Sequence, residues 1–311
     1  MIIKPDCMSQ GKGIFITNDI ESIPKDEIYV VQQYMQNPHL IDGLKYDLRL
    51  YVLILSCDPL KIFLYNDGLV RFATHKYKPI DLAATDKKDM NNFFMHLTNY
   101  AVNKENENFK QAKGANDDTG HKRTLKKVLE RLRKNDMDVD KIMGEVKDVI
   151  VKTLISIQGE LSHNYRTCQP ADLENLMCFE ILGFDIIISE EGKPVLLEVN
   201  QAPSFATESP LDYEIKKGLF CDTFRLLGLS VEKKKAKIKR LYEEKKERML
   251  TKQTLKQKNL TRKYAMQEFK REQDIYEQSN HGNFEKLYPL PIREAGESNQ
   301  KTQDAPDMTT T

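Results

Sequence analysis

Residues 184–200 have the sequence FDIIISEEGKPVLLEVN, and this stretch decides the fold of the chain. Two apolar runs flank a Glu-Glu-Gly-Lys turn, a pattern that predicts a β-hairpin. Asp185 opens the first strand, and Glu198 and Asn200 close the second. Residues two apart on a strand point to the same face, so Glu198 and Asn200 lie together. Asp185 lies across from them if the strands pair in simple register.

These three side chains form a candidate metal site at one end of the hairpin. Carboxylate and amide oxygens suit Mg²⁺, which takes one or two protein carboxylates and completes its shell with water and phosphate oxygens. A surface hairpin with scattered charges is the alternative interpretation of the same residues.

A glycine-rich loop near the start of the chain is a candidate phosphate site. Residues 1–3 predict a short strand that ends at Lys4-Pro5, and Gln10-Gly11-Lys12-Gly13 precedes a second strand at residues 14–16. Two glycines around a lysine would give a flexible loop whose backbone N–H groups could cover phosphates. The loop matches neither the P-loop nor the Rossmann pattern, so an ordinary glycine-rich hairpin stays open as an alternative.

Alternating charges introduce the strand predicted at residues 45–55. Lys45, Asp47 and Arg49 share one face of this strand and lead into an apolar run. Three charges on one face are costly to bury unpaired, but they suit a face that meets a nucleotide and a metal ion. An exposed edge strand is the alternative. The extended run at residues 30–35 could set backbone groups against an adenine edge.

Seven short blocks follow one another along the chain. They are Lys4-Pro5, Gln10-Gly11-Lys12-Gly13, Gln32-Gln33-Tyr34, Lys45-Tyr46-Asp47-Leu48-Arg49, Gly68-Leu69-Val70-Arg71-Phe72-Ala73, His96-Leu97-Thr98-Asn99-Tyr100 and Leu197-Glu198-Val199-Asn200-Gln201-Ala202-Pro203-Ser204-Phe205. In this order they resemble the tubulin–tyrosine ligase-like family of ATP-grasp ligases. The resemblance implies an α+β fold in residues 1–230, an ATP-grasp ligase core of mixed and antiparallel sheets packed with helices. It also implies that the family's N-terminal domain is missing ahead of this core.

The resemblance implies positions for ATP and for two Mg²⁺ ions. The implied ATP-binding residues are Lys4, Gln10, Gly11, Gln32, Gln33, Tyr34, Met35, Lys45, Tyr46, Asp47, Thr98 and Asn99. Asp185, Glu198 and Asn200 are the implied magnesium ligands, with Glu198 bridging the two ions. Arg49 and Glu198 are the implied catalytic residues. His96 is expected to be a hydrogen-bonded structural histidine.

The resemblance further implies an ATP-dependent tubulin–glutamate ligase, acting in tubulin polyglutamylation. In this chemistry ATP converts a tubulin-tail carboxylate into an acyl phosphate, and the amino group of free L-glutamate attacks it. Arg71, Tyr100 and Lys122 are implied to hold the amino acid, and Gln201 stands at a position implied to meet the tubulin tail. Arg71 and Lys122 favour an amino acid with a second carboxylate. The alternatives are a glycylase or tyrosine ligase, and a non-catalytic microtubule-binding remnant.

Charge is strongly segregated, although the whole chain carries only +1. Residues 232–272 hold 16 Lys and Arg against 6 Asp and Glu, a net charge of +10, whereas residues 273–311 carry −4 and residues 1–231 carry −5. Residues 231–275 are predicted as one basic helical region, in which the 41 residues 232–272 would extend about 60 Å as a single helix. The resemblance implies that it binds microtubules, through Lys233, Lys234, Lys235, Lys237, Lys239, Arg240. A solvated helix is the alternative, and nucleic acid is disfavoured because aromatic interleaving and a known module are lacking.

Periodicity predicts the remaining elements. Helices are expected at residues 124–134, 139–161 and 212–227, a loop at 103–119, and a break at 164–170. Residues 276–311, rich in Asn, Gly, Pro, Glu, Ser and Thr, are predicted to be a disordered tail.

Composition is typical of a cytosolic enzyme core. The five cysteines form no Cys-x-x-Cys pair and predict reduced thiols. No apolar run reaches about 18 residues, so no membrane helix is expected. Together with the resemblance, this predicts a monomer in the cytoplasm and on the cytoskeleton, with the cilium or basal body as further locations.

Overall fold

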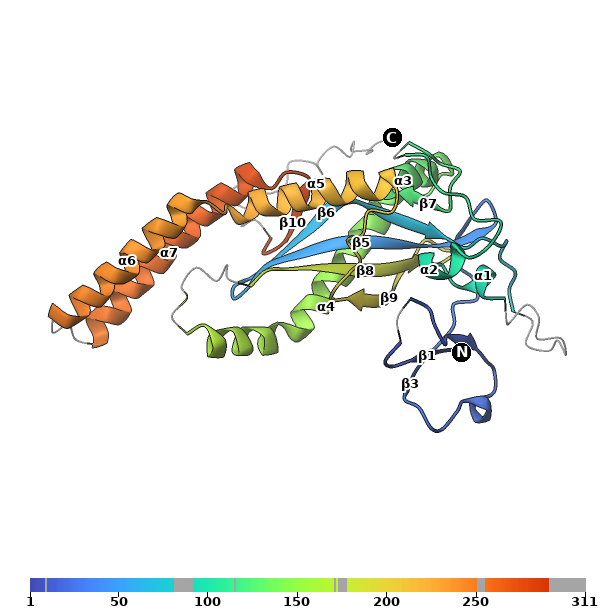
Figure 1. The fold of residues 1–311 in the computed structure, drawn as a ribbon, viewed down its shortest axis with the longest axis horizontal. Coiled ribbons are helices and arrows are strands. Elements are labelled where there is room, and N and C mark those ends of the chain that lie inside the picture. The colour runs from blue at the N-terminus through green and yellow to red at the C-terminus, as the bar shows by residue number, and fades with distance from the viewer. Residues whose placement is uncertain are drawn as a thin grey trace, which may run out of the picture.

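The computed structural model describes residues 1–8, 10–80, 92–114, 116–170, 172, 178–250 and 255–290. A seven-stranded sheet forms its centre, with the strand order β10-β6-β5-β8-β9 and with β4 and β7 added to β5 and β6 (Figure 1). Every pairing is antiparallel. The strands are β4 (Leu40–Ile41), β5 (Leu44–Cys57), β6 (Leu60–Phe72), β7 (Lys122–Thr124), β8 (Glu180–Ile188), β9 (Pro194–Asn200) and β10 (Phe284–Tyr288).

Helices cover both faces of this sheet, which explains the apolar composition of its middle strands. On one face, α3 (Leu125–Lys134) and α4 (Val139–Cys168) pack against alternate residues of β5 such as Leu48 and Leu50. On the other face, α5 (Pro210–Leu227) packs against Tyr51 and Leu53. The charged residues predicted to share a face of β5 lie on the α5 side, because side chains alternate along a strand.

A second, three-stranded sheet lies beside the first (Figure 1). Its order is β2-β1-β3, all antiparallel. A small apolar cluster, which includes Ile16, Tyr34 and Met95, joins it to the segment that carries the short helices. The remaining elements are β1 (Ile2–Pro5), β2 (Phe15–Ile16), η1 (Ile20–Ser22), β3 (Tyr29–Gln32), α1 (Phe93–His96) and α2 (Tyr100–Asn103).

Most of the predicted elements are confirmed. The 184–200 hairpin forms as β8 and β9, and α3 begins at the predicted place, with Thr124 as its N-cap. α5 has an N-terminal cap at Ser209 and ends at Gly228, which adopts a left-handed φ of 60°. The predicted break at 164–170 is wrong, because α4 continues to Cys168. The last turn of α4 contains Tyr165, whose ring is buried and whose hydroxyl donates a hydrogen bond to Asp172.

The basic segment is two helices and not one. α6 (Val231–Leu250) leads away from the sheet and α7 (Leu255–Asn280) returns beside it (Figure 1). We call this helical pair the arm. The return is required because the chain after α7 enters the sheet as β10, which pairs with β6.

The predicted disordered tail is therefore wrong for residues 276–290, and residues 291–311 lie outside the described part of the chain. Phe284 on β10 is only 1% exposed and packs edge-on against Phe63 and Tyr65, with ring centroids 6.5 and 5.1 Å away. None of the described helices combines the length and the apolar character needed to cross a membrane.

A buried ionic network fixes the base of the arm to the sheet. Lys61 on β6 donates to Glu277 at 2.6 Å and to Asp274 at 3.1 Å, and Lys286 on β10 donates to Glu277 at 2.8 Å. Glu277 is 1% exposed and Lys61 6% exposed, so water does not substitute for these contacts. The network joins α7 to two neighbouring strands.

We expect Glu277→Gln to lower the free energy of unfolding by about 3 kcal/mol, because it leaves the buried Lys61 without its closest counter-charge. Urea denaturation followed by circular dichroism measures this change. Glu272→Gln, at an exposed position of the same helix, is the matched control and should leave the midpoint unchanged. Equal midpoints for the two variants would show that the network does not stabilise the fold.

Candidate functional site

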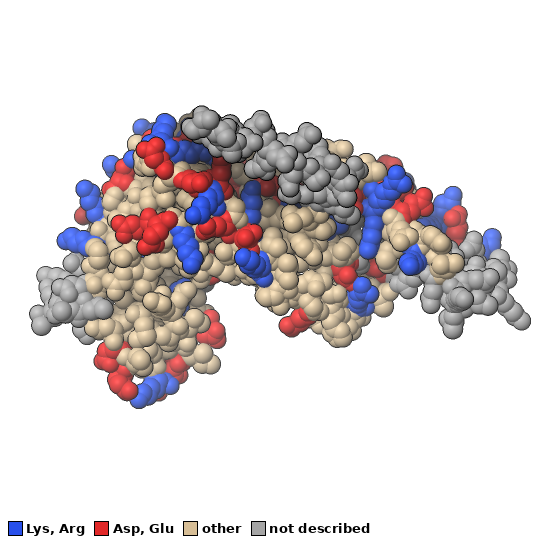
Figure 2. All heavy atoms as spheres, turned by 180° about the vertical axis from the view of Figure 1, so that it is seen from behind, with Lys and Arg blue, Asp and Glu red and all other residues tan. Residues whose placement is uncertain are grey.

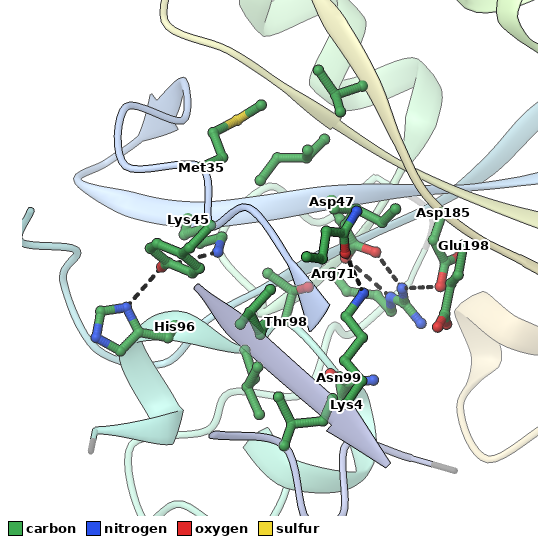
Figure 3. A pocket seen from close by; sticks show the side chains of 18 of the residues that line it. Lys4, Met35, Lys45, Asp47, Arg71, His96, Thr98, Asn99, Asp185 and Glu198 are labelled. Carbon is green, nitrogen blue, oxygen red and sulfur yellow. Dashed lines mark hydrogen bonds and ion pairs between the residues drawn. The ribbon is translucent and has the colours of Figure 1, made fainter. Parts of the chain in front are cut away.

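A pocket opens where the small sheet meets the large one (Figure 3). Its empty space is about 740 Å³ when the open mouth is included. Twelve of the predicted site residues line it: Lys4, Gln32, Gln33, Tyr34, Met35, Lys45, Asp47, Arg71, Thr98, Asn99, Asp185 and Glu198. They come from β1, β3 and the segment after it, β5, β6, β8, β9 and the segment between α1 and α2, so residues far apart in the sequence converge here.

Charged side chains at one end of the pocket are paired across three neighbouring strands. The register sets Asp47 opposite Arg71, and Arg49 opposite Asp185. Arg71 donates to Asp47 and also to Asp185, the latter at 2.7 Å, and Arg49 donates to both oxygens of Asp185. Because these side chains are nearly buried, each charge depends on the others.

The predicted cluster of Asp185, Glu198 and Asn200 is confirmed. β8 and β9 pair Asp185 with Glu198, and the amide nitrogen of Asn200 lies 3.3 Å from Asp185 and 3.2 Å from Glu198. Burial, together with the neighbouring Asp185, raises the pKa of Glu198. Burial opposes ionisation of Asp185 as well, but Arg71 and Arg49 hold the pKa of Asp185 well below its usual value.

This donor set fits a hard divalent cation. Two carboxylates face one another with an amide beside them, and carboxylate and amide oxygens are the ligands that Mg²⁺ prefers. Within the described ranges, no group of three or more His, Cys, Asp or Glu side chains is arranged to hold a metal ion. The candidate site therefore depends on two carboxylates, with room left for water and phosphate oxygens.

The opposite end of the pocket holds a buried lysine in an aromatic environment. The ammonium group of Lys45 lies 3.2 Å from the Tyr34 hydroxyl and 4.5 Å from the centre of its ring. The Tyr34 hydroxyl also lies 2.8 Å from Nδ1 of His96, which agrees with the structural role expected for that histidine. Burial lowers the pKa of Lys45 to about 7, an effect that Asp47 opposes and Lys4 increases.

The apolar residues that line the pocket had not been predicted from the sequence. Ile187 on β8 and Val195 and Leu197 on β9 face the pocket, as do Ile2, Ile14 and Leu97. Alternation could have identified Ile187, because Asp185 and Ile187 share one face of β8. It could not have identified Val195 and Leu197, because a β-bulge between Leu196 and Glu198 interrupts the alternation along β9. An apolar slot beside basic residues suits a flat ring joined to phosphates.

A second charged cluster adjoins the pocket. The β6–β7 ladder sets Lys122 opposite Arg71, and the Lys122 ammonium lies 4.4 Å from the centre of the Tyr100 ring. The structure thus brings Tyr100 and Lys122 together as predicted, although neither lines the pocket itself. Lys122 also contacts Asp212 on α5, which in turn contacts Lys216. Asp212 and Lys216 had been missed because an acid and a base four residues apart on a helix are typical of a surface pair.

Comparison with known proteins agrees with this arrangement. Residues 1–239 match the tubulin-tyrosine ligase family. This chain belongs to that family. It is 43% identical to mouse tubulin polyglutamylase TTLL13 and 43% identical to human tubulin polyglutamylase TTLL6, over 94% and 93% of its own length. It is 38% identical to Xenopus tropicalis tubulin polyglutamylase TTLL7 over 93% of its length. The chain covers 36%, 31% and 33% of these relatives, so it spans about a third of each.

Three of the positions expected to bind ATP do not line the pocket. The expectation that the Tyr46 side chain meets ATP is corrected, because this side chain lies in the core and is only 1% exposed. Its hydroxyl lies 2.9 Å from His39, and its ring packs on Phe72. Gln10 and Gly11 adopt left-handed φ angles of 64° and 82° in a loop beside Asn99, at the rim. A Cβ on Gly11 would lie 3.1 Å from the Asn99 side chain, so glycine is required there.

The basic residues expected to meet tubulin lie on α6, which extends away from the pocket (Figure 1). Lys234, Lys235, Lys239 and Arg240 are exposed, whereas the side chains of Lys233 and Lys237 lie outside the described part. Figure 2 shows basic and acidic side chains mixed on the arm, so this view has no uniform positive stripe. Gln201 is also exposed and directly follows Asn200.

Replacing Lys45 with methionine tests its burial. The folded chain releases the Lys45 proton near pH 7, whereas an unfolded chain keeps it to about pH 10. Between these two pH values the unfolded chain binds a proton that the folded chain does not. The free energy of unfolding of the wild type therefore rises with pH across this range. Lys45→Met abolishes that rise.

We accordingly expect the free energy of unfolding of the wild type to rise relative to that of Lys45→Met between about pH 6.5 and pH 9.5. Urea denaturation at both values measures it. Lys12→Met, at an exposed lysine of the glycine-rich loop, should give no pH-dependent difference. A difference of the same size at both pH values would contradict the lowered pKa.

Proposed function

We propose that this chain is the catalytic part of an ATP-dependent ligase that adds glutamate to glutamate side chains of tubulin C-terminal tails. The observation that carries the proposal is the pair of carboxylates formed by buried Asp185 and Glu198, which face one another across β8 and β9 in a pocket that also holds Lys4 and Lys45. The carboxylates suit a metal ion and the neighbouring ammonium groups suit phosphates, so together they suit a metal–nucleotide complex. Relatives named tubulin polyglutamylases support the choice of tubulin and of glutamate.

The pocket offers a distinct environment for each part of ATP. The apolar slot near Ile187 and Leu197 suits the adenine ring, and Tyr34 and Met35 border it. The ammonium groups of Lys4 and Lys45 suit the phosphates. Asp185, Glu198 and Asn200 would hold Mg²⁺, two ions in this proposal, and the metal would neutralise charge on the transferring phosphoryl group.

Arg49 has a supporting part in this proposal. Its guanidinium group donates to both carboxylate oxygens of Asp185, which orients that carboxylate toward Glu198. A lysine could not make this planar two-point contact. Arg49 thus acts on the reaction through Asp185 and keeps the carboxylate ionised.

The second cluster is proposed to hold the amino-acid co-substrate. In the proposed reaction, ATP converts a tail carboxylate into an acyl phosphate, the amino group of free glutamate attacks it, and phosphate leaves. Arg71, Tyr100 and Lys122 lie on the side of the pocket next to Asp185, where this attack would occur. Two cationic side chains suit an amino acid with a second carboxylate, which favours glutamate over glycine or tyrosine.

The arm is proposed to bind the acidic surface of microtubules, with Gln201 meeting the tail near the reaction centre. Exposed Lys234, Lys235, Lys239 and Arg240 supply the attraction. The proposal extends to a cytoplasmic monomer on the cytoskeleton, with the cilium or basal body as further places where modified microtubules occur. Free L-glutamate and ATP are the small-molecule partners.

Mass spectrometry of tubulin tails tests the proposed function. Tubulin is incubated with the chain, ATP, Mg²⁺ and an equal mixture of amino acids, and the tails are then analysed. We expect mass increments of glutamate on tail glutamates, dependent on ATP. Mass increments of glycine or tyrosine alone would identify that amino acid, and not glutamate, as the co-substrate. No increment with any amino acid would favour the non-catalytic microtubule-binding alternative.

We expect Glu198→Gln to reduce ligation to background while leaving the fold intact. The change removes one charge from the proposed metal ligands without removing volume, so packing changes little. Ligation on microtubules and urea denaturation measure the two effects. Glu190→Gln, in the exposed turn of the same hairpin, is the control and should ligate normally. Wild-type ligation by Glu198→Gln would overturn the metal assignment.

Charge reversal on the arm should weaken microtubule binding and spare ATP binding. Lys234, Lys235, Lys239 and Arg240 are changed to Glu, and cosedimentation with microtubules is measured at low and raised salt. The wild-type attraction should itself fall with salt, because the Debye length is only about 8 Å at physiological ionic strength.

The matched control reverses four exposed lysines of the body. These are Lys25, Lys126, Lys134 and Lys152. The control should pellet with microtubules nearly as well as wild type. If the two variants pellet with microtubules to the same extent, the arm is a solvated helical pair. Tubulin recognition then lies in the part of the chain outside the arm.

A further inference from the structure

Asp212 is a buried carboxylate beside the pocket that receives donors from two separate elements. It lies in the first turn of α5 and is 1% exposed. The ammonium group of Lys122, on β7, lies 2.7 Å from each of its oxygens, and Lys216, one turn further along α5, lies 3.2 Å from one of them. The hydroxyl of the N-cap residue Ser209 lies 2.8 Å from the other oxygen.

The two lysines that Asp212 joins are themselves nearly buried. The side chains of Lys216 and Lys122 are 6% and 12% exposed. Two ammonium groups at such short range repel strongly where water is scarce, and one carboxylate between them offsets that repulsion. Glu208 also faces Lys122, but it is exposed and bonded to the Tyr100 hydroxyl. The buried part of the cluster therefore keeps one positive charge in excess.

The cluster begins directly across the β6–β7 ladder from Arg71, which lines the pocket. An anion placed between Lys122 and Lys216 would thus lie next to the end of the pocket that holds Asp185. Asp212 lies in the first turn of α5, contacts both ammonium groups, and is not among the residues that line the pocket.

We infer that Asp212 is a positioning residue, which holds Lys122 and Lys216 so that both ammonium groups meet a carboxylate of the amino-acid co-substrate. The inference rests on the proposed function. Asp212 fixes where the two ammonium groups lie, and the remaining positive charge selects an acidic amino acid. Asp212 does not itself contact the co-substrate.

Direct binding of L-glutamate tests this role. The chain is saturated with Mg²⁺ and a non-hydrolysable ATP analogue, and glutamate is titrated in by calorimetry. Asp212→Asn keeps the shape and removes the charge, so glutamate should bind at least tenfold more weakly while the affinity for the ATP analogue changes less than twofold. Asp222→Asn is the matched control. Asp222 lies on the same helix and is 9% exposed, but it contacts Arg225 and the backbone of Asn283.

Asp212→Glu separates the position of the charge from its presence. This variant keeps the carboxylate, so the lysines stay paired and the chain folds even if Asp212→Asn does not. Its affinity for glutamate should fall between those of wild type and Asp212→Asn. Wild-type affinity in Asp212→Glu, or in Asp212→Asn, would overturn the inference alone.

Two further outcomes have separate meanings. Parallel loss of glutamate and ATP-analogue binding in Asp212→Asn would show a general structural role and overturn the inference. If the wild-type chain binds the ATP analogue but no glutamate, the co-substrate part of the proposed function fails, and the inference fails with it.

Discussion

Four charges on three adjacent strands hold the middle of this molecule in one arrangement. Asp47 and Arg49 on β5 meet Arg71 on β6 and Asp185 on β8, so each acid has a basic partner on a neighbouring strand. A shift of either pairing by one residue would turn these side chains to the opposite, apolar face and leave them unpaired. The same ion pairs therefore set the register of the sheet and the geometry of the pocket. Because Asp47 and Arg49 are paired in this way, the charged residues at the start of β5 can be buried.

The strand β6 carries this constraint from one end of the sheet to the other. Arg71 near its end faces the pocket, and Lys61 at its start holds Glu277 of the arm. Ten residues of strand separate the two ion clusters, about 33 Å in an extended chain. The arm is therefore fixed to the strand that also carries a charged residue of the pocket. A single strand thus connects the base of the arm with the pocket.

Local patterns predicted which side chains of one hairpin or one strand lie together, whereas pairings between distant segments escaped prediction. Asp185 and Glu198 belong to one hairpin, so alternation and turn chemistry were enough to bring them together. The alternation that placed Lys45 on the pocket face also sets Tyr46 on the opposite face, and only the family resemblance had argued otherwise. β10 escaped because nothing in residues 284–288 reveals that β6, more than 200 residues earlier, needs an edge partner. Asp212 escaped for a similar reason, since its main partner is on β7.

The return of the chain into the sheet changes the meaning of its charge segregation. A free acidic tail after a basic arm could fold back on the arm and compete with an acidic partner. Residues 273–311 contain seven acids, and three of them are used within the body. Asp274 and Glu277 bind Lys61, and Glu285 binds Lys147 on α4 at 2.7 Å. These acids neutralise the sheet and α4, so they do not neutralise the arm. These three acids therefore do not offset the basic excess of residues 232–272.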